Sequence, residues 1–284
     1  MKVLVLGASG MLGNAMVRVL GKQPEWQVFG TLRSDGGRRY FTSTENDRLI
    51  SGVDVEQIDS LVKVFSQVRP DVVVNCIGLV KQLADAKDPL LALPINAMLP
   101  HRLERLCELA GARLVHMSTD CVFSGQRGRY AETDLPDAID LYGRSKLLGE
   151  VSGNRSITLR TSIIGHELQS QHALINWFLA QEGRCFGHRK AIFSGFPTVV
   201  LAEIIRDVII PRDDLAGVFH VAAEPISKYD LLKMVAETYG KEIEIIPDDS
   251  VVIDRSLDSS RFNKITGFVP PSWPAMIAKM HESK

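Results

Sequence analysis

A set of closely spaced glycines near the start of the chain is the feature that most constrains the fold. Residues 3–6 read as a buried strand and residues 11–20 have helical spacing. Gly7 and Gly10 lie between them, and Gly13 follows in the first turn of the predicted helix. Glycines there permit a tight turn and let the backbone approach a pyrophosphate. The free N–H groups of the helix start favour the same anion. The pattern therefore predicts a dinucleotide-binding turn. Its predicted contact residues are Gly7, Ser9, Gly10, Met11, Leu12 and Gly13.

Strand-like and helix-like segments alternate through the first 165 residues. The predicted strands are 3–6, 28–32, 72–74, 114–117 and 157–159, and the predicted helices are 11–20, 57–67, 96–110 and 141–149. Crossovers of this length join parallel strands. The predicted fold class is α/β, a Rossmann-type doubly wound parallel sheet with a smaller, mostly helical C-terminal substrate lobe.

The pattern changes in the second half of the chain. Helices are predicted at 172–180, 202–208, 228–239 and 272–280, with strands at 218–221 and 243–246. The polar stretches 35–46 and 126–136 are predicted to be loops above the sheet. We therefore expect a cofactor-binding domain in 1–165, with a return to it around 195–222, and a smaller substrate-binding lobe in 166–284.

Composition and charge exclude several classes of protein. The 284 residues carry a formal net charge of −1, so the basic surface of a nucleic-acid binder is missing. The four cysteines form no C-x-x-C pair, and the seven histidines lack metal-ligand spacing. No apolar stretch is long enough to span a membrane. The expectation is a cytoplasmic protein with reduced thiols and without metal.

The second strand ends at a basic residue. A site selective for NAD usually has Asp or Glu at this place, where it holds the ribose 2′-hydroxyl. Arg33 is suited instead to a 2′-phosphate. The sequence thus favours NADPH over NADH, with a solvated loop arginine as the alternative.

A tyrosine and a lysine four residues apart supply candidate acid–base chemistry. Tyr142 and Lys146 share one face of the predicted helix. A free tyrosine has a pKa of about 10, and a nearby ammonium brings that pKa toward neutral pH. This spacing is common by itself, but Ser118 and Thr119 end the strand some two dozen residues upstream. A hydroxyl there is suited to bind a substrate oxygen beside the tyrosine.

Taken together, these motifs resemble the extended short-chain dehydrogenase/reductases. The resemblance runs in order through the glycine turn, Asn75-Cys76-Ile77-Gly78, Ser118-Thr119-Asp120 and Tyr142…Lys146. Within that superfamily the chain is most similar to the dTDP-4-dehydrorhamnose reductases and related nucleotide-sugar 4-ketoreductases. Segments 117–125, 142–147 and 159–162 carry this closer similarity.

The resemblance implies a role for each matching residue. Tyr142 would be the acid, Lys146 its electrostatic partner, and Thr119 the donor to the substrate oxygen, with Ser118 as the competitor for that role. Asn96 would support the lysine through water. Further implied cofactor contacts are Asp54, Val55, Asn75, Cys76, Ile77, Gly78, Ser118, Tyr142 and Lys146.

Substrate binding is expected from the second lobe and from the loop after residue 78. The candidates are Lys81, Asp120, Trp177, Thr198 and Arg255. Trp177 is suited to stack on a nucleotide base and Arg255 to pair with a diphosphate. Trp177 is equally well explained as a core aromatic residue, and Arg255 as a solvated charge. Two departures from the family pattern are Cys121, where an aromatic residue is common, and the run 162–165 after Arg160.

The expected activity is NADPH-dependent reduction of a nucleotide-activated 4-keto-6-deoxy sugar, in the synthesis of cell-surface polysaccharide sugars. Related dehydratases carry Asp-Glu after the threonine, whereas this chain has Asp120-Cys121, which disfavours dehydration. The alternatives are a nucleotide-sugar epimerase or epimerase–reductase, and a non-catalytic NADP-binding regulatory subunit like that of methionine adenosyltransferase. The nucleotide sugar is the expected partner, and the family suggests a homodimer.

Overall fold

The computed structural model describes residues 1–79 and 87–284. The chain forms two compact units. Unit 1 comprises 1–118, 139–159 and 202–218, and unit 2 comprises 119–138, 160–201 and 219–284. The chain thus passes between the units several times, whereas the sequence analysis predicts one boundary near residue 165 and a return around 195–222.

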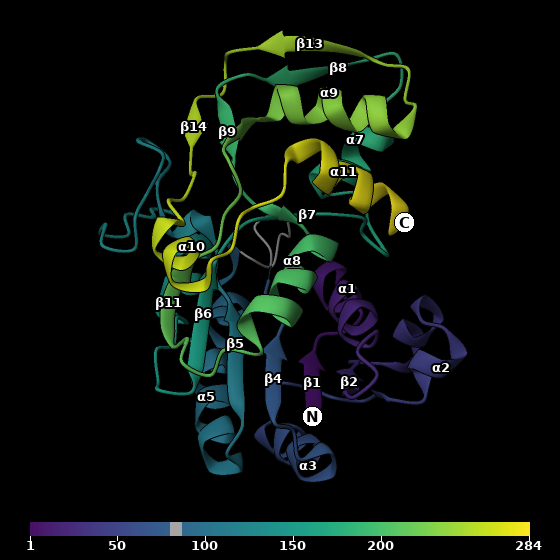
Figure 1. Ribbon diagram of the computed structural model, residues 1–284, viewed down its shortest axis with the longest axis vertical. Helices are drawn as coiled ribbons and strands as arrows, with labels where there is room; N and C mark the ends of the chain where they lie inside the picture. The colour runs from purple at the N-terminus through teal and green to yellow at the C-terminus, as the bar shows by residue number, and fades with distance from the viewer. Residues whose placement is uncertain (80–86) are drawn as a thin grey trace. The chain divides into compact units, whose positions relative to one another are not determined.

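A seven-stranded sheet with the order β11-β6-β5-β4-β1-β2-β3 organises unit 1 (Figure 1). Its strands are β1 (Lys2–Leu6), β2 (Gln27–Thr31), β3 (Leu49–Ile50), β4 (Val72–Asn75), β5 (Arg113–Met117), β6 (Ser156–Arg160) and β11 (Gly217–His220). Neighbours from β3 through β6 pair in parallel. The strand order reverses between β1 and β4, and doubly wound sheets bind ligands at the carboxyl ends of the strands at such a point. The Rossmann-type prediction is confirmed.

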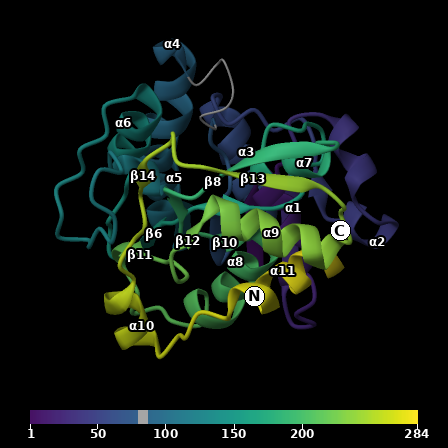
Figure 2. The ribbon, with the colours of Figure 1, turned by 90° about the horizontal axis from the view of Figure 1, so that it is seen from above.

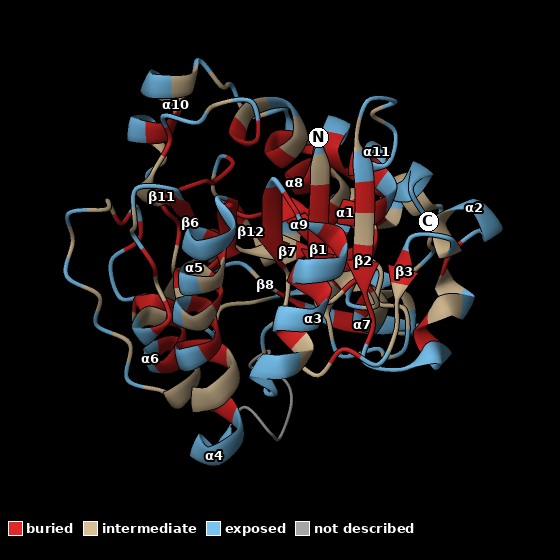
Figure 3. Cartoon of the chain, turned by 90° about the horizontal axis from the view of Figure 1, so that it is seen from below, coloured by how far each residue is buried: buried red, intermediate tan, exposed pale blue. Residues whose placement is uncertain are grey.

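Helices cover both faces of this sheet. The helices of unit 1 are α1 (Met11–Leu20), α2 (Ser43–Asn46), α3 (Ile58–Val68), α4 (Pro89–Ala92), α5 (Leu99–Ala110) and α6 (Leu141–Leu148). Alternate strand residues such as Leu4, Val73 and Leu114 pack with α3 and α5 in one hydrophobic cluster. The central strands β4, β5 and β6 are buried throughout, while the outer sides of α3 and α5 are exposed (Figure 3). Each fully buried leucine contributes about 2 kcal/mol relative to an exposed one.

Two helical segments of unit 1 depart from regular α geometry. The helix predicted from residue 96 has its regular part only from Leu99, because Leu93–Met98 is a π-helix, and a second π-helix covers Ile205–Ile209 after α8 (Thr198–Ile204). The stretch 35–46, predicted as loop, contains a 3-10 helix at Asp35–Tyr40 followed by α2.

Unit 2 combines helices with three small sheets. Its helices are a 3-10 turn at Asp120–Val122, α7 (Leu174–Leu179), α9 (Lys228–Tyr239), α10 (Ser260–Thr266) and α11 (Trp273–Glu282). Its strands are β7 (Ile163–Ile164), β8 (Arg184–His188), β9 (Ala191–Phe193), β10 (Phe196–Pro197), β12 (Ile226–Ser227), β13 (Glu244–Asp248) and β14 (Ile253–Asp254). They pair as β12-β9-β14, β13-β8 and β10-β7. Figure 2 shows α9 beside β8 and β13, and Gly187 of β8 makes this approach possible, since a Cβ there would lie 2.7 Å from the Tyr229 ring.

Within the described ranges, no helix is both long and apolar enough to cross a membrane. The same residues include no group of three or more His, Cys, Asp or Glu side chains placed to hold a metal ion. All four cysteines are free thiols.

Candidate active site

The glycine turn joins β1 to α1 in a form that leaves the helix start open. Gly7 has a φ of +81°, which glycine adopts without strain, and its carbonyl accepts the N–H of Gly10 at 3.0 Å. A Cβ on Gly13 would lie 2.0 Å from the Gly7 oxygen, so only glycine permits this packing. Gly10 is the N-cap of α1 and offers no capping side chain. The first N–H groups of the helix therefore remain suited to an anionic ligand.

Arg33 follows β2 with its side chain exposed. In the described part of the chain the structure gives it no hydrogen bond or ion pair. Its neighbour Arg38, by contrast, is fixed by Asp35, Ser51 and two backbone carbonyls. The Arg33 guanidinium therefore has no partner among the described residues and is available to a ligand.

Asp54 lies half-buried after β3. Its Oδ1 accepts the N–H of Glu56 at 3.0 Å, and its own N–H donates to Ser60 Oγ at 3.1 Å. Val55 is also half-buried and packs against the core cluster of α3 and α5. These contacts fix a turn at Asp54 and Val55, two of the predicted cofactor contacts.

Asn75 ends β4 and is wholly buried. Its Nδ2 lies 3.1 Å from Nδ1 of His116 on β5, and its Oδ1 accepts the N–H of Ile77 at 3.1 Å. Burial, together with the neighbouring Lys146 ammonium, lowers the pKa of His116 well below its ordinary value, so the ring is neutral. Asn75 therefore holds the backbone of the predicted cofactor segment 75–78 through its side chain. That segment adjoins the glycine turn, because a Cβ on Gly7 would lie 2.7 Å from Ile77.

Tyr142 and Lys146 both lie on α6, as predicted. Asp140 caps the helix by accepting the N–H of Gly143 at 2.8 Å. Lys146 is 5% exposed, and its Nζ donates to the carbonyl of Met117 at the end of β5, at 2.6 Å. Burial lowers the pKa of Lys146 from 10.5 to about 8, while the charge of Glu150 opposes this. The lysine thus points to the carboxyl ends of the central strands.

Asn96 clamps the segment after β4 to α6. Its Oδ1 accepts the N–H of Leu79 at 2.9 Å, and its Nδ2 donates to Ser145 Oγ at 3.2 Å. The site of a Cβ on Gly78 would lie 3.4 Å from Asn96 Oδ1 and 3.8 Å from Lys146 Nζ. Gly78 thus allows the lysine ammonium to lie close to the main chain.

Ser118 and Thr119 use their hydroxyl groups differently. Ser118 donates to Glu150 Oε1 at 2.7 Å within unit 1. Thr119, the first residue of its segment of unit 2, accepts the N–H of Cys121 at 3.1 Å and donates to Asp120 Oδ1 at 3.1 Å. Both hydroxyl protons therefore have protein acceptors in this structure.

Asp120 is a buried carboxyl group in unit 2, 8% exposed. Burial raises its pKa, while hydrogen bonds from Cys121, Thr119 and Ser162 and the charge of Arg255 oppose the rise. Arg255 is held in place because its Nε donates to the Phe123 carbonyl at 2.8 Å.

Lys228, the first residue of α9, belongs to the same cluster. Burial lowers its pKa, the charge of Asp120 raises it, and that of Arg255 lowers it again. Lys228 is not among the residues predicted from the sequence. A lysine in the first turn of a helix lies at the positive end of the helix dipole, which is unfavourable, and this unusual position could have indicated a role for it.

The remaining predicted substrate residues are placed separately in unit 2. Trp177, on α7, is 37% exposed, while Thr198, at the start of α8, is only 7% exposed. Lys81 lies outside the described residues.

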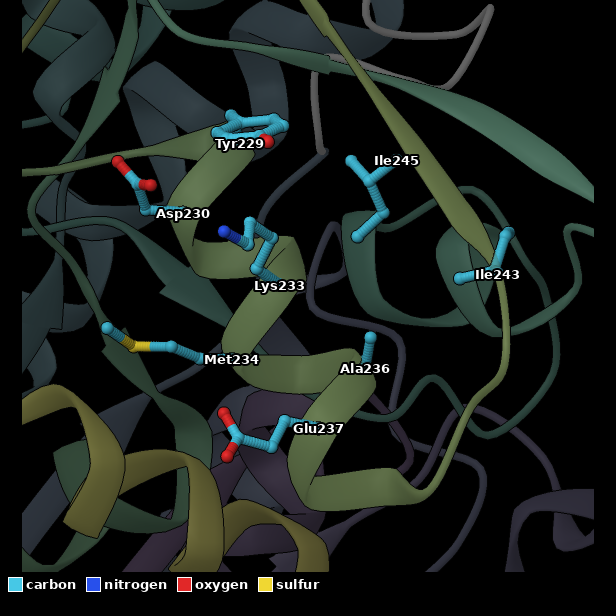
Figure 4. Close-up of a pocket in the computed structure, with 8 residues that line it drawn as sticks. All are labelled: Tyr229, Asp230, Lys233, Met234, Ala236, Glu237, Ile243 and Ile245. Atoms are coloured by element: carbon cyan, nitrogen blue, oxygen red, sulfur yellow. The ribbon is translucent and has the colours of Figure 1, made fainter.

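A cavity of about 500 Å³ lies in unit 2 between α9 and β13 (Figure 4). It is lined by Tyr229, Asp230, Lys233, Met234, Ala236, Glu237, Ile243 and Ile245. In the close-up, Ala236 of α9 lies toward Ile243 and Ile245, whereas the charged side chains of the helix extend away from them. None of the predicted site residues that the structure describes is among its lining residues.

Comparisons with known proteins agree with this architecture. The mouse methionine adenosyltransferase 2 subunit beta is 26% identical over 98% of this chain and 89% of its own length. The probable low-salt glycan biosynthesis reductase Agl14 of Haloferax volcanii is 32% identical, over 53% of this chain and 48% of its own.

Solved structures show the same fold over nearly the whole chain. A dTDP-4-dehydrorhamnose reductase from Bacillus anthracis, in complex with NADP, superposes with a TM-score of 0.81 at 22% identity and covers 99% of both chains. The Bordetella bronchiseptica enzyme WbmG, in complex with NAD, gives 0.78 at 19% identity, over 99% of this chain and 93% of its own.

The sheet order and the match to these solved structures define a Rossmann-type α/β fold. More specifically, the model of the RmlD substrate binding domain matches residues 1–283, and the chain belongs to that family. The predicted resemblance is thereby confirmed.

Proposed function

We propose that this protein is an NADPH-dependent reductase of a nucleotide-activated 4-keto-6-deoxy sugar, acting in the synthesis of cell-surface polysaccharide sugars. The observation that carries the proposal is the buried Lys146, four residues from Tyr142, with its ammonium on the Met117 carbonyl and beside Gly78. A tyrosine with a charged lysine at the carboxyl ends of parallel strands is suited to proton transfer next to a bound dinucleotide.

The residues of unit 1 fit NADPH. The open start of α1 and the glycine packing at Gly7 and Gly13 suit a diphosphate, and the unpartnered Arg33 suits a 2′-phosphate. NADPH, when bound, would supply the hydride. The NADP complex of the Bacillus anthracis reductase supports this choice, while the NAD complex of WbmG keeps NADH as the second candidate.

The side chains of the chain itself handle the proton. Tyr142 donates its phenolic proton to the sugar oxygen, and the Lys146 ammonium stabilises the phenolate that is left. Thr119 donates a hydrogen bond to the same oxygen and stabilises the charge that develops there. Because its proton is directed at Asp120, the Thr119 hydroxyl must rotate to do so.

Unit 2 supplies the proposed substrate contacts. The Nε of Arg255 is anchored to Phe123, so the rest of the guanidinium is suited to a diphosphate in a bidentate pair. Trp177 is partly exposed and suited to stack on the base. Asp120 and Thr198 are largely buried, at 8% and 7% exposed, and would contact the sugar through single polar atoms.

A second candidate is a non-catalytic NADP-binding regulatory subunit. It is favoured by the near full-length similarity to methionine adenosyltransferase 2 subunit beta. An epimerase remains the other enzymatic alternative, because it uses the same tyrosine and lysine but returns the hydride.

The test is NADPH oxidation with dTDP- and UDP-linked 4-keto-6-deoxyhexoses. A reductase consumes NADPH in proportion to the sugar alcohol formed, whereas an epimerase inverts a nucleotide-linked sugar alcohol with NADP⁺ and leaves no net NADPH. Tyr142→Phe should lower turnover by at least about 100-fold, the size of a general acid contribution, and leave NADPH affinity unchanged. Tight NADPH binding without turnover of any sugar would favour the regulatory subunit, and an unchanged rate in the Phe variant would refute Tyr142 as the acid.

A further inference from the structure

Glu150 follows α6, and both its backbone and its side chain are fixed by hydrogen bonds. Its backbone N–H donates to the Leu147 carbonyl at 3.1 Å and so continues the last helical turn. Its carboxylate accepts the Ser118 hydroxyl at 2.7 Å. The side chain thus connects the end of α6 with the end of β5, and the roles described above for Tyr142, Lys146 and Thr119 make no use of it.

Gly149 explains how Glu150 comes to lie there. A Cβ at residue 149 would lie 1.9 Å from the Asn96 carbonyl oxygen, so the chain passes directly against the π-helix. The Gly149 N–H also donates to the carbonyls of Ser145 and Lys146, at 3.2 and 3.1 Å. Only glycine allows this crossing, and the residue that follows it reaches back to β5.

The Glu150 carboxylate and the Lys146 ammonium are held by adjacent residues. Lys146 donates to the carbonyl of Met117, and Glu150 accepts from the side chain of Ser118. The end of β5 therefore holds an ammonium and a carboxylate through two neighbouring residues.

The surroundings of Lys146 supply little else to keep it charged. On β5, His116 is neutral because of its burial, and Asn96 and Gly78, near the ammonium, carry no charge. Among the described residues, Glu150 is the carboxylate whose charge acts against the loss of the lysine proton.

We propose that Glu150 is a positioning residue of this active site: Ser118 anchors it on the end of β5, and from there its carboxylate keeps Lys146, which is bound to the adjacent Met117 carbonyl, protonated. The inference rests on the proposed function for the use that is made of Lys146.

The test measures the titration of Lys146 directly. Lysine side chains labelled with carbon-13 are followed by NMR across neutral and alkaline pH, and Lys146→Met identifies the signal. In Glu150→Gln, which keeps the shape and an oxygen to accept from Ser118, the Lys146 midpoint should move to lower pH by roughly one unit. The loss of NADPH turnover at alkaline pH should move by the same amount. Coincident midpoints in the wild type and the Gln variant would overturn the proposal.

Two further variants keep the test decisive. Glu108→Gln removes a carboxylate on α5 whose side chain is 50% exposed, and should leave the Lys146 midpoint unchanged. Ser118→Ala keeps the Glu150 charge but removes its anchor, and should move the midpoint in the same direction by a smaller amount. If Glu150→Gln does not fold, the Ser118→Ala measurement decides, and an unmoved midpoint then contradicts the proposal.

The titration requires neither cofactor nor sugar. Absence of turnover with every sugar would count against the proposed reductase, whereas the Lys146 midpoint would still decide the role of Glu150. The two failures are therefore distinguishable.

Discussion

Replacing Lys146 by methionine should abolish turnover and, at the same time, stabilise the protein without cofactor at neutral pH. The lysine is charged and 5% exposed, and its pKa is lowered from 10.5 to about 8 by burial. A base whose pKa falls on folding holds its proton less well in the folded than in the unfolded state. Its charge therefore opposes folding below pH 8, and this penalty disappears as the pH rises from 8 to 10.5.

The size of the effect follows from that shift. A shift from 10.5 to about 8, at about 1.4 kcal/mol per unit, gives an upper limit of about 3.5 kcal/mol at pH 7. Methionine has a similar length but leaves the Met117 carbonyl without its donor, which costs about 1 kcal/mol. The expected net gain in the free energy of unfolding is therefore at most about 2.5 kcal/mol.

Urea unfolding of the wild type and Lys146→Met, without cofactor, measures this difference at neutral and at alkaline pH. The advantage of the variant should be largest at neutral pH and should fall as the pH rises from 8 to 10.5, the ordinary pKa of lysine. Above pH 10.5 the variant should be less stable by about 1 kcal/mol, because only the lost hydrogen bond to Met117 then remains. Lys63→Met, at an exposed lysine on α3, is the matched control and should show no such pH dependence. A variant less stable than the wild type at neutral pH, or an advantage independent of pH, would refute the reasoning.

Two further predictions concern the cofactor. Gly13→Ala should lower the free energy of unfolding by about 1–3 kcal/mol and weaken NADPH binding, because its Cβ would lie 2.0 Å from the Gly7 oxygen. Thermal unfolding measures the loss of stability. Gly36→Ala is the control, because a Cβ there would have only the Ser34 side chain nearby, at 3.8 Å. Arg33→Ala should weaken NADPH by about 10- to 100-fold in titration calorimetry while sparing NADH, since only NADPH carries the 2′-phosphate; equal losses for both cofactors would contradict the role of Arg33.

Local patterns in the sequence predicted the elements that position the cofactor. The glycine turn, the helix over residues 11–20 and the parallel strands arise from periodicities that a short stretch of chain already contains. Tyr142 and Lys146 were found for the same reason, because a spacing of four residues defines one side of a helix.

Contacts between distant residues were beyond this reasoning. Asn75 and His116 are 41 residues apart, Ser118 and Glu150 are 32 apart, and Phe123 and Arg255 are 132 apart. The small sheets of unit 2 were missed, apart from β13, because strands of two to five residues are defined by their partners rather than by their own pattern. The π-helix at Leu93–Met98 was missed because its side chains are as apolar as those of a regular helix.

The π-helix at Leu93–Met98 limits which deletions this part of the chain can tolerate. A π-turn holds one residue more than an α-turn, and one residue of a helix corresponds to a rotation of about 100°. The extra residue lets Leu99 and Leu103 point into the core while Asn96 points to α6. A relative shorter by one residue in this segment would keep its apolar stripe and its folded helix, but the asparagine would turn away from Ser145. The loss of one residue from this segment would therefore remove the hydrogen bond between Asn96 and Ser145 without unfolding the helix.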